Sequence, residues 1–305
     1  MQYTFSGQYH LTVNAAFFAI ILAFTSCEKV VNVHLSPTPP ALVVQGQIET
    51  GLPPVVILTT SISFFSKIDL TTLQNSFVHG ATVTVSDGSR TMNLKEYYLD
   101  TLGTNKIYYY TLDTTNLGNI FVGQVEHFYT LTIIYNGKTY TSVTKIPNPA
   151  PIDTLYTGTP LFTDNKTPKN ALQLFTDYSD PDTIGNYVKY FTSRDHQAYY
   201  PANNVFSDEV INGNKITQLG LQVGYNDSTN VNSDSLRYLY PGDTITVKWC
   251  SIDKGVYTFW NTYQFALNAV GNPFASPINV TSNISNGALG VWAGYGTYFK
   301  TLIVK

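Results

Sequence analysis

Charged residues are scarce in this sequence. Asp, Glu, Lys and Arg together make up 12% of its 305 residues, whereas about 25% is usual in soluble proteins. The formal net charge is −3 at pH 7, so the chain has neither the basic field that nucleic-acid binding requires nor a polybasic patch for anionic lipids. Its solubility must instead come from Asn, Thr, Ser, Gln and Tyr side chains, a composition common in exported β proteins.

Cysteine is almost absent as well, because the chain has only Cys27 and Cys250. They cannot build the framework of disulfides that stabilises many small secreted domains, so packing must stabilise the fold. We interpret Cys250, which ends an apolar segment, as a small buried hydrophobic residue. A nucleophilic cysteine would need a histidine partner, and the sequence does not place one near it.

Motifs of catalysis and of metal or cofactor binding are missing too. After residue 27 the histidines stand at positions 34, 79, 127 and 196, too far apart to form a metal-ligand pair by spacing. There is no Gly-x-Ser-x-Gly nucleophile elbow and no phosphate-binding glycine loop. The aspartates within residues 177–182 lack the glycine and the final glutamate of an EF-hand loop. We therefore expect a protein that is not an enzyme and that has no catalytic residue, no metal and no cofactor.

No apolar run reaches the length of about 20 residues that a membrane-spanning helix needs. The longest run, Leu11 to Phe24, is followed by Thr25, Ser26 and Cys27. A short apolar core that ends in small residues predicts a signal peptide over residues 1–26, with Cys27 as the site of lipidation. The match has two departures, because residues 1–10 contain no Lys or Arg and Phe24 stands where Leu is usual. The alternatives are a cleavage site nearby with Cys27 incidental, or a buried N-terminal strand.

The segments that follow are typical of a β protein. Residues 27–41 contain three prolines and predict a lipid-anchored tether. The pattern of Val, Ile, Thr, Tyr and Phe then predicts strands at 42–48, 55–60, 81–86, 91–95, 106–112, 127–135 and 138–145. The Asp87-Gly88 and Asn136-Gly137 pairs favour the positive φ angles of tight hairpin turns. Together these strands predict an immunoglobulin-like β-sandwich over residues 42–146.

A proline-rich linker at residues 147–151 predicts a boundary before a second β-sandwich-like domain at 152–305. Its strands are expected at 152–157, 171–178, 187–193, 206–211, 219–225, 244–251 and 298–304. Apolar residues recur at helical spacing from 253 to 270 and predict one amphipathic helix, with Asp253 as N-cap, Gly271 after its end and Pro273 beyond. We interpret its aromatic stripe as a packing face. The glycines at 287–296 lack a strand-to-helix crossover and are typical of close backbone approach or bulges within a sheet.

Tyrosine is the most unusual component, with 23 residues in the chain. Exposed aromatic rings on a rigid β scaffold suit stacking on sugars or contacts with other proteins. The candidate binding residues are Tyr109, Tyr199, Tyr200, Trp292 and Tyr295. Ordinary pairing of aromatic residues within the sheet is the competing interpretation.

A series of segments carries a resemblance to a known family. The segments are Cys27, residues 42–48, 79–88, 137–142, 147–153, 271–277 and 282–291. In this order they resemble the Bacteroidota outer-membrane lipoprotein family known as domain of unknown function 4249, whose genes often lie beside genes of TonB-dependent receptors. Gln45 departs from the Glu expected in the Val-Val-Glu-Gly version of the first strand, which argues against a catalytic use of that position.

The resemblance implies a lipid-anchored accessory protein of the outer membrane that can face the cell surface. Its expected partners are the membrane, through the lipid on Cys27, and a TonB-dependent transporter. The family brings no known catalytic residue to carry over. The alternative function is a stand-alone surface module that binds carbohydrate or peptide.

Overall fold

The computed structural model describes residues 39–63, 66–101, 105–165, 167–209, 212–226, 236–272, 276 and 278–305. The chain divides into two compact units, Met1–Pro39 and Pro40–Lys305. The second unit contains nearly all of the described residues. The predicted signal peptide, Cys27 and nearly all of the predicted tether lie outside the described residues. Within the described part of the chain, no helix combines the length and the apolar character needed to cross a bilayer.

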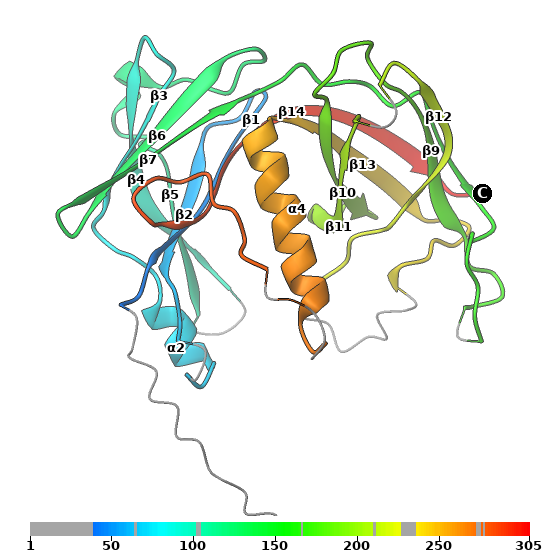
Figure 1. Ribbon diagram of the computed structural model, residues 1–305, viewed down its shortest axis with the longest axis horizontal. Helices are drawn as coiled ribbons and strands as arrows, with labels where there is room; N and C mark the ends of the chain where they lie inside the picture. Colours follow the sequence, from blue (N-terminus) through cyan, green and yellow to red (C-terminus); the bar gives the residue numbers. More distant parts are fainter. Residues whose placement is uncertain are drawn as a thin grey trace, which may run out of the picture. The chain divides into compact units, whose positions relative to one another are not determined.

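The fold is mainly β, with one large sheet, one small sheet and one main helix, which is consistent with the predicted β-sandwich class (Figure 1). The first half contributes β1 (Leu42–Glu49), β2 (Val55–Thr60), β3 (Thr82–Ser86), β4 (Thr91–Asp100), β5 (Lys106–Leu112), β6 (Phe128–Tyr135) and β7 (Lys138–Lys145). The second half contributes β8 (Thr154–Gly158), β9 (Gln173–Ser179), β10 (Tyr187–Arg194), β11 (Tyr200–Ser207), β12 (Lys215–Leu221), β13 (Thr244–Ile252) and β14 (Leu289–Ile303). The helices are α2 (Leu70–Asn75), the 3-10 turn η1 (Leu117–Asn119) and α4 (Lys254–Ala269).

Strand pairing runs through both halves of this unit. The large sheet has the order β11-β10-β13-β14-β1-β2-β5-β4-β3-β6-β7, and the small sheet has the order β12-β9-β8. The last strand, β14, joins the halves because it pairs with β1 in parallel and with β13 antiparallel. Pairing through β14 therefore connects the two predicted β domains on either side of residues 147–151.

Glycines make this junction possible. Gly290 has a φ of 103°, and a Cβ placed on it would lie 1.9 Å from the carbonyl oxygen of Val44 in β1. A Cβ on Gly296 would lie 1.9 Å from the carbonyl oxygen of Pro147. Only glycine allows backbones to approach so closely. The prediction that the glycines of 287–296 mark close backbone approach or bulges is confirmed as close approach for Gly290, Gly294 and Gly296, whereas a Cβ on Gly287 would meet nothing within 4 Å.

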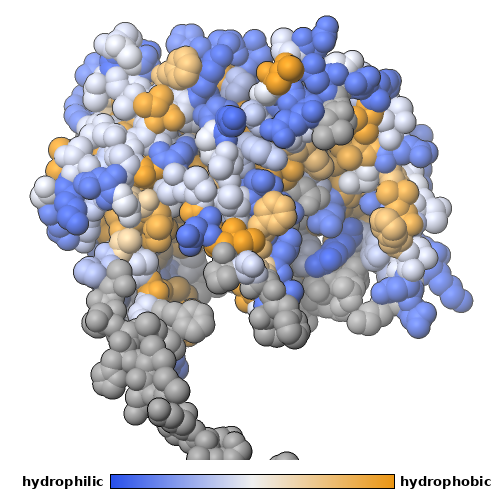
Figure 2. Space-filling view, in the orientation of Figure 1, coloured by the Kyte–Doolittle hydropathy of each residue, from blue (hydrophilic) through white to orange (hydrophobic). Residues whose placement is uncertain are grey.

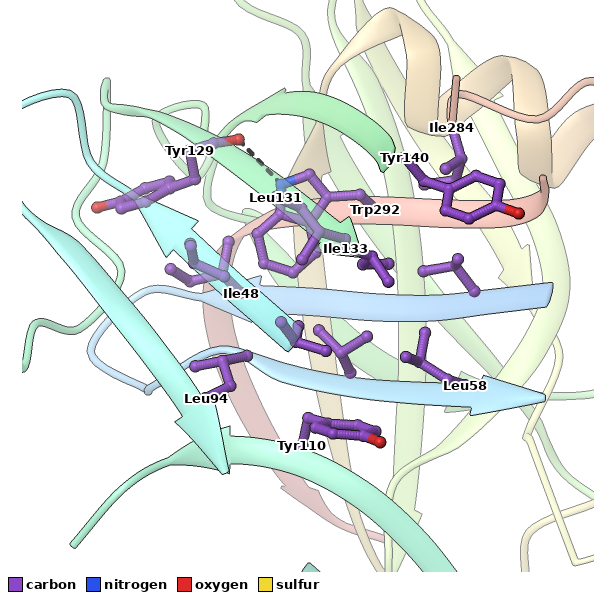
Figure 3. Close-up of a cluster of buried hydrophobic side chains, with 14 of the residues drawn as sticks. Ile48, Leu58, Leu94, Tyr110, Tyr129, Leu131, Ile133, Tyr140, Ile284 and Trp292 are labelled. Carbon is purple, nitrogen blue, oxygen red and sulfur yellow. Dashed lines mark hydrogen bonds between the residues drawn. The ribbon is translucent and has the colours of Figure 1, made fainter. Parts of the chain in front are cut away.

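Two hydrophobic cores lie beside the sheet, and a third lies under α4. The first is built largely from β1 to β7, but it also takes in Trp292 of β14. Figure 3 shows the Trp292 indole among these side chains, with Nε1 donating to the carbonyl oxygen of Tyr129 at 2.9 Å. The second core gathers residues of β9 to β13, including Tyr190 and Trp249. Because Trp292 comes from the end of the chain, the first core is complete only when β14 has docked.

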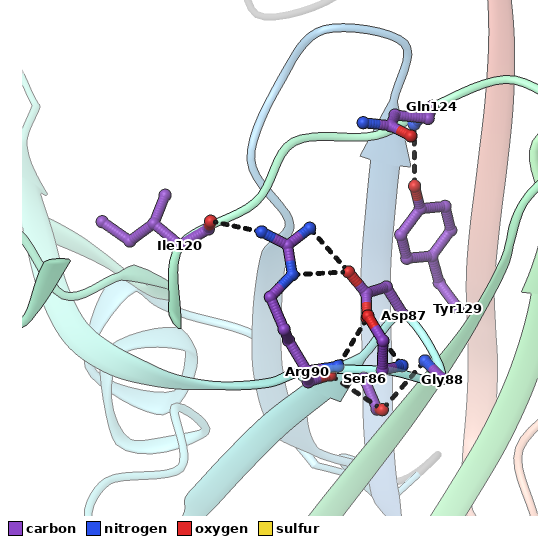
Figure 4. A network of polar contacts seen from close by, with 8 residues as sticks. Ser86, Asp87, Gly88, Arg90, Ile120, Gln124 and Tyr129 are labelled. Carbon is purple, nitrogen blue, oxygen red and sulfur yellow. Dashed lines mark hydrogen bonds and ion pairs between the residues drawn. The ribbon is translucent and has the colours of Figure 1, made fainter. Parts of the chain in front are cut away.

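The β3–β4 turn shows why the Asp-Gly signal predicted a hairpin. Asp87 Oδ1 accepts hydrogen bonds from the backbone N–H groups of Ser89 and Arg90, and Oδ2 pairs with the Arg90 guanidinium at 2.8 Å (Figure 4). Gly88 has a φ of 90°. Partial burial raises the pKa of Asp87, but the hydrogen bonds from Arg90 and Ser89 outweigh it, so the pKa lies well below its usual range. The turn is therefore held by an ionised carboxylate.

Several elements differ from the prediction. β14 begins at Leu289, although a strand was predicted only from residue 298. The glycines before residue 298 have little strand propensity, so the sequence did not indicate a strand there. In the structure this segment is extended because β14 pairs with β1 on one side and with β13 on the other. β11 ends at Ser207, although a strand was predicted over residues 206–211, of which 210 and 211 lie outside the described residues. Its Pro201 is tolerated because β11 is an edge strand. The short helix α2 was not predicted, since six residues show no periodicity.

Candidate functional site

A groove of about 600 Å³ lies between α4 and the large sheet. Helix α4 contacts β10, β11 and β14, and Figure 1 shows it beside β10 and β11. The groove is lined by Val43, Val44, Gln45, Lys189, Pro201, Val205, Phe259, Trp260, Tyr263, Gln264, Leu267, Gly290 and Val291. Its volume falls in the range that holds a small molecule or a short peptide segment.

The start of α4 is fixed by its N-cap, Asp253. One carboxylate oxygen, Oδ1, accepts from the backbone N–H of Val256 at 2.9 Å, as a capping residue should. The other oxygen, Oδ2, accepts from Thr144 Oγ1 at 2.6 Å and from the backbone N–H of Lys145 at 3.0 Å. One side chain therefore caps the helix and ties it to β7. The predicted N-cap is confirmed, and Gly271, which was predicted to follow the end of the helix, comes directly after the C-cap Val270 with a φ of 82°.

The apolar stripe of α4 serves two purposes along its length. Val256 and Phe259 are buried in the core under the helix. Trp260, Tyr263 and Leu267 come next at helical spacing, and they line the groove. On the face that Figure 2 shows, hydrophobic residues are scattered among hydrophilic ones. Trp260 also packs against the core under the helix, so the stripe serves as the predicted packing face as far as Trp260 and continues along the groove with Tyr263 and Leu267.

The aromatic rings of the groove are held in place. Trp260 Nε1 donates to the hydroxyl of the buried Tyr295 at 3.2 Å. The Trp260 and Tyr263 rings meet edge to face with centroids 5.8 Å apart, and Phe259 stacks on Tyr263 at 5.9 Å. Rings that are fixed before a ligand arrives lose little conformational entropy on binding. The groove therefore offers prearranged aromatic surface.

Lys189 places a positive charge in this groove. It is only 3% exposed, and its Nζ lies 4.4 Å from the centroid of the Trp260 ring and donates to the carbonyl oxygen of Ala202 at 3.2 Å. Burial lowers the pKa of Lys189 to about 8. Among the described residues, no carboxylate lies within ion-pair distance of its ammonium. A buried charge without a counter-charge is costly, so this ammonium favours an anionic group in the groove.

A second buried lysine nearby shows the contrast. The Nζ of Lys248 lies 2.9 Å from Glu49 Oε1, so its charge is compensated within the protein. Both ammonium groups lie over the ring of Phe191, Lys189 at 5.6 Å and Lys248 at 4.5 Å from its centroid. Of this pair of buried lysines, Lys189 is the one that can accept a counter-charge from outside.

The candidate residues predicted from the sequence do not line this groove. Tyr109 is half-buried in β5, where its ring lies 6.2 Å from that of Tyr97. Tyr199 is 40% exposed and lies against Phe299 at 5.8 Å, which leaves part of its ring accessible. Tyr200 is half-buried at the start of β11.

Trp292 and Tyr295 are core residues. They are 0% and 2% exposed, respectively, and therefore present no ring face at the surface. Tyr295 still bears on the groove, because its hydroxyl orients the Trp260 indole. Cys27 lies outside the described residues.

Lys189, Trp260 and Tyr263 were not singled out by sequence reasoning. A signal for Lys189 was present, since it stands within the otherwise apolar run 187–191, where a strand buried on both faces would carry no charge. Trp260 and Tyr263 gave no separate signal, because aromatic residues that pack and aromatic residues that line a groove share the same helical spacing.

The chemistry that the groove can perform is limited. Lys189 and Tyr263 are the titratable residues among the described residues that line it, and the lining contains no carboxylate, histidine or thiol. Cys250 is fully buried, as predicted, and burial raises the pKa of its thiol far above the usual value. Within the described residues, no group of three or more His, Cys, Asp or Glu could hold a metal ion. The arrangement of a buried ammonium beside fixed aromatic rings can bind an anionic group.

A comparison with protein families gives one finding. The model of the family described as Domain of unknown function (DUF4249) matches residues 28–301 of the chain. No curated protein and no solved structure matches the chain.

Proposed function

We propose, from the premise that the chain belongs to the DUF4249 family, that it is a non-catalytic lipoprotein which binds a ligand in the α4 groove. Its place would be the outer membrane of a Bacteroidota cell, anchored through Cys27, beside a TonB-dependent transporter. The lipidation motif and the family resemblance support the anchor and the partner. The observation that supports ligand binding best is Lys189, a buried ammonium beside a fixed Trp260 ring.

The groove favours a ligand that combines an apolar or aromatic body with one anionic group. The rings of Trp260 and Tyr263 supply a surface for the body, and Lys189 supplies the counter-charge for the anion. A charge-assisted hydrogen bond in a site that excludes water is stronger than a neutral one. Peptides with a free terminal carboxylate have this chemistry.

We expect the substitution Lys189→Met to weaken binding of such peptides at least tenfold, because one charge-assisted hydrogen bond contributes about 1.5–3 kcal/mol. Calorimetry with short N-acetylated peptides, each compared with its C-terminal amide, measures this directly. Lys254→Met is the matched control, since Lys254 lies on α4, the helix that borders the groove, but is exposed and does not line the groove. The proposed site would be contradicted if the protein bound the peptide acid and the peptide amide with equal affinity. It would also be contradicted if Lys189→Met and Lys254→Met lost the same amount of affinity.

Binding should also depend on pH. Because Lys189 has a pKa near 8, its protonated fraction falls about tenfold between pH 7 and pH 9. Affinity for a carboxylate peptide should fall by about the same factor over this range. The Lys189→Met variant should lose this dependence. A flat profile in the unmodified protein would show that Lys189 does not pair with the ligand.

A stand-alone module that binds peptide or carbohydrate is the second candidate function. It is favoured by the fixed rings of Trp260 and Tyr263 on the groove, because such rings suit stacking on a sugar or a peptide side chain. Under this alternative, ligand affinity would be the same whether or not a transporter is present.

A further inference from the structure

A second, smaller cavity lies on the other side of β10. Its volume is about 190 Å³, and an apolar cavity of about 150 Å³ can hold a molecule the size of benzene. It is lined by Tyr178, Asp180, Asn186, Val188, Phe206, Ser207, Asp208, Ile216, Leu219 and Trp249. None of these residues lines the α4 groove. Adjacent strand residues point to opposite faces, so Val188 faces this cavity and Lys189 faces the groove.

Aromatic rings form much of its wall. Trp249 lies between two of them, with ring centroids 5.4 Å from Tyr178 and 6.2 Å from Phe206. The ring of Tyr190 also stacks on Trp249, with the two ring centroids 5.9 Å apart. Such ring faces carry negative potential and attract cations.

Two buried carboxylates complete the lining. Asp208 is 1% exposed, and its Oδ2 accepts from the backbone N–H groups of Gly185 at 2.8 Å and Asn186 at 2.9 Å. Asp180 Oδ2 accepts from the backbone N–H of Gly213 at 3.1 Å, and its Oδ1 lies 3.4 Å from the Tyr178 hydroxyl. Neither aspartate forms an ion pair with a basic residue in the described part of the chain.

Polar atoms of this lining lack a partner. Among the residues that the structure describes, Asp208 Oδ1 and Trp249 Nε1 are buried and have no hydrogen-bond partner. Native proteins pair nearly all such atoms, because a buried unpaired group costs about 1–3 kcal/mol. Burial raises the pKa of Asp180, and the charge of Asp208 raises it further. A positive group in the cavity would relieve both the missing hydrogen bond and the repulsion between the carboxylates.

We propose that this cavity binds a small organic cation, an ammonium compound that also carries a hydrogen-bond acceptor. The ammonium donates to Asp208 Oδ1 and lies against the ring of Trp249 or Phe206. The acceptor takes the hydrogen bond of Trp249 Nε1. This site is independent of the α4 groove and of any transporter.

Calorimetry on the protein tests this site with ethanolamine, N-methylethanolamine and N,N-dimethylethanolamine, which each carry an N–H donor and a hydroxyl acceptor, and with ethylene glycol as the neutral match of ethanolamine. We expect at least one cation to bind saturably and ethylene glycol to bind at least tenfold more weakly. This comparison uses the unmodified protein, so it does not depend on a variant that folds. Absence of saturable binding by all three cations, or equal binding of ethylene glycol, would show that the cavity holds only water and would overturn the proposal.

Variants locate the bound cation. Asp208→Asn should weaken binding at least tenfold. Asp180→Asn should weaken it severalfold, because its one amide oxygen can still accept from the backbone N–H of Gly213 while its NH2 group can donate to the Tyr178 hydroxyl. Lys254→Met, at an exposed position on α4, is the control and should leave cation binding unchanged. An unchanged affinity in both aspartate variants, with their folding verified by circular dichroism, would place the cation elsewhere and contradict the proposal.

Discussion

The substitution Gly296→Ala is expected to prevent folding or to lower the free energy of unfolding by about 4 kcal/mol. The added Cβ would lie 1.9 Å from the carbonyl oxygen of Pro147, an overlap that only movement of the backbone can relieve. Gly296 sits in β14, where it pairs with Ser251 of β13, so the strand cannot move away without losing that pairing. Thermal unfolding followed by circular dichroism should show a Tm lower by about 10 °C.

Gly118→Ala is the matched control for this prediction. The nearest atom to a Cβ at Gly118 is Asn116 Oδ1 at 3.8 Å, an ordinary contact. The control should change Tm by no more than about 2 °C. If Gly296→Ala were equally mild, the residue 147–151 segment would not pack against β14 as described.

The substitution Lys248→Met is expected to lower the free energy of unfolding by about 3 kcal/mol or more. It leaves the carboxylate of Glu49, only 5% exposed, without the ammonium that lies 2.9 Å away. The hydrogen bond from Gln47 Nε2 to Glu49 Oε1, at 3.2 Å, remains but does not neutralise the charge. Denaturant unfolding of the purified variant measures the loss.

A double-mutant cycle separates the lost charge pair from lost packing. Combining Glu49→Gln with Lys248→Met removes both charges, so the double variant should be more stable than Lys248→Met alone. Additive losses in the two single variants would contradict the ion pair. The pair joins β1 to β13 across β14, so its coupling energy also reports on the order of strands in the large sheet.

Local features of the fold were predictable from the sequence. Strands β2, β5 and β7 have the predicted bounds, because alternating β-branched and aromatic residues between turn residues fix both their start and their end. The Asp87-Gly88 turn and the Asp253 N-cap were predictable for a related reason, since each depends on a side chain that bonds to backbone groups two or three residues away.

Long-range features were not predictable in the same way. The parallel pairing of β1 with β14 joins residues about 245 positions apart. A local sequence pattern cannot predict a pairing between such distant segments. Trp292 was predicted as a candidate binding residue, yet it fills the core beside Tyr129, because a tryptophan in a glycine-rich strand gives no sign of which face is covered.

The candidate site depends on distant parts of the chain in the same way. The α4 groove unites β1, β10, β11, α4 and β14, so its volume cannot be seen in any one segment. The sequence shows Lys189 as a charged residue within an apolar run. That no carboxylate of the described residues lies within ion-pair distance of Lys189 depends on the folded structure and could not be predicted from the sequence. The small cavity likewise combines distant residues, because Asp208 follows the end of β11 and Trp249 lies in β13.

The most direct test of the proposed function is purification of the affinity-tagged protein from detergent-solubilised outer membranes of the organism that encodes it, followed by mass spectrometry. We predict that a TonB-dependent transporter is recovered in near-stoichiometric amount, and that a Cys27→Ala variant is lost from the membrane fraction. Recovery of the protein alone from the soluble fraction, with the same distribution for Cys27→Ala, would contradict both the lipid anchor and the transporter partner.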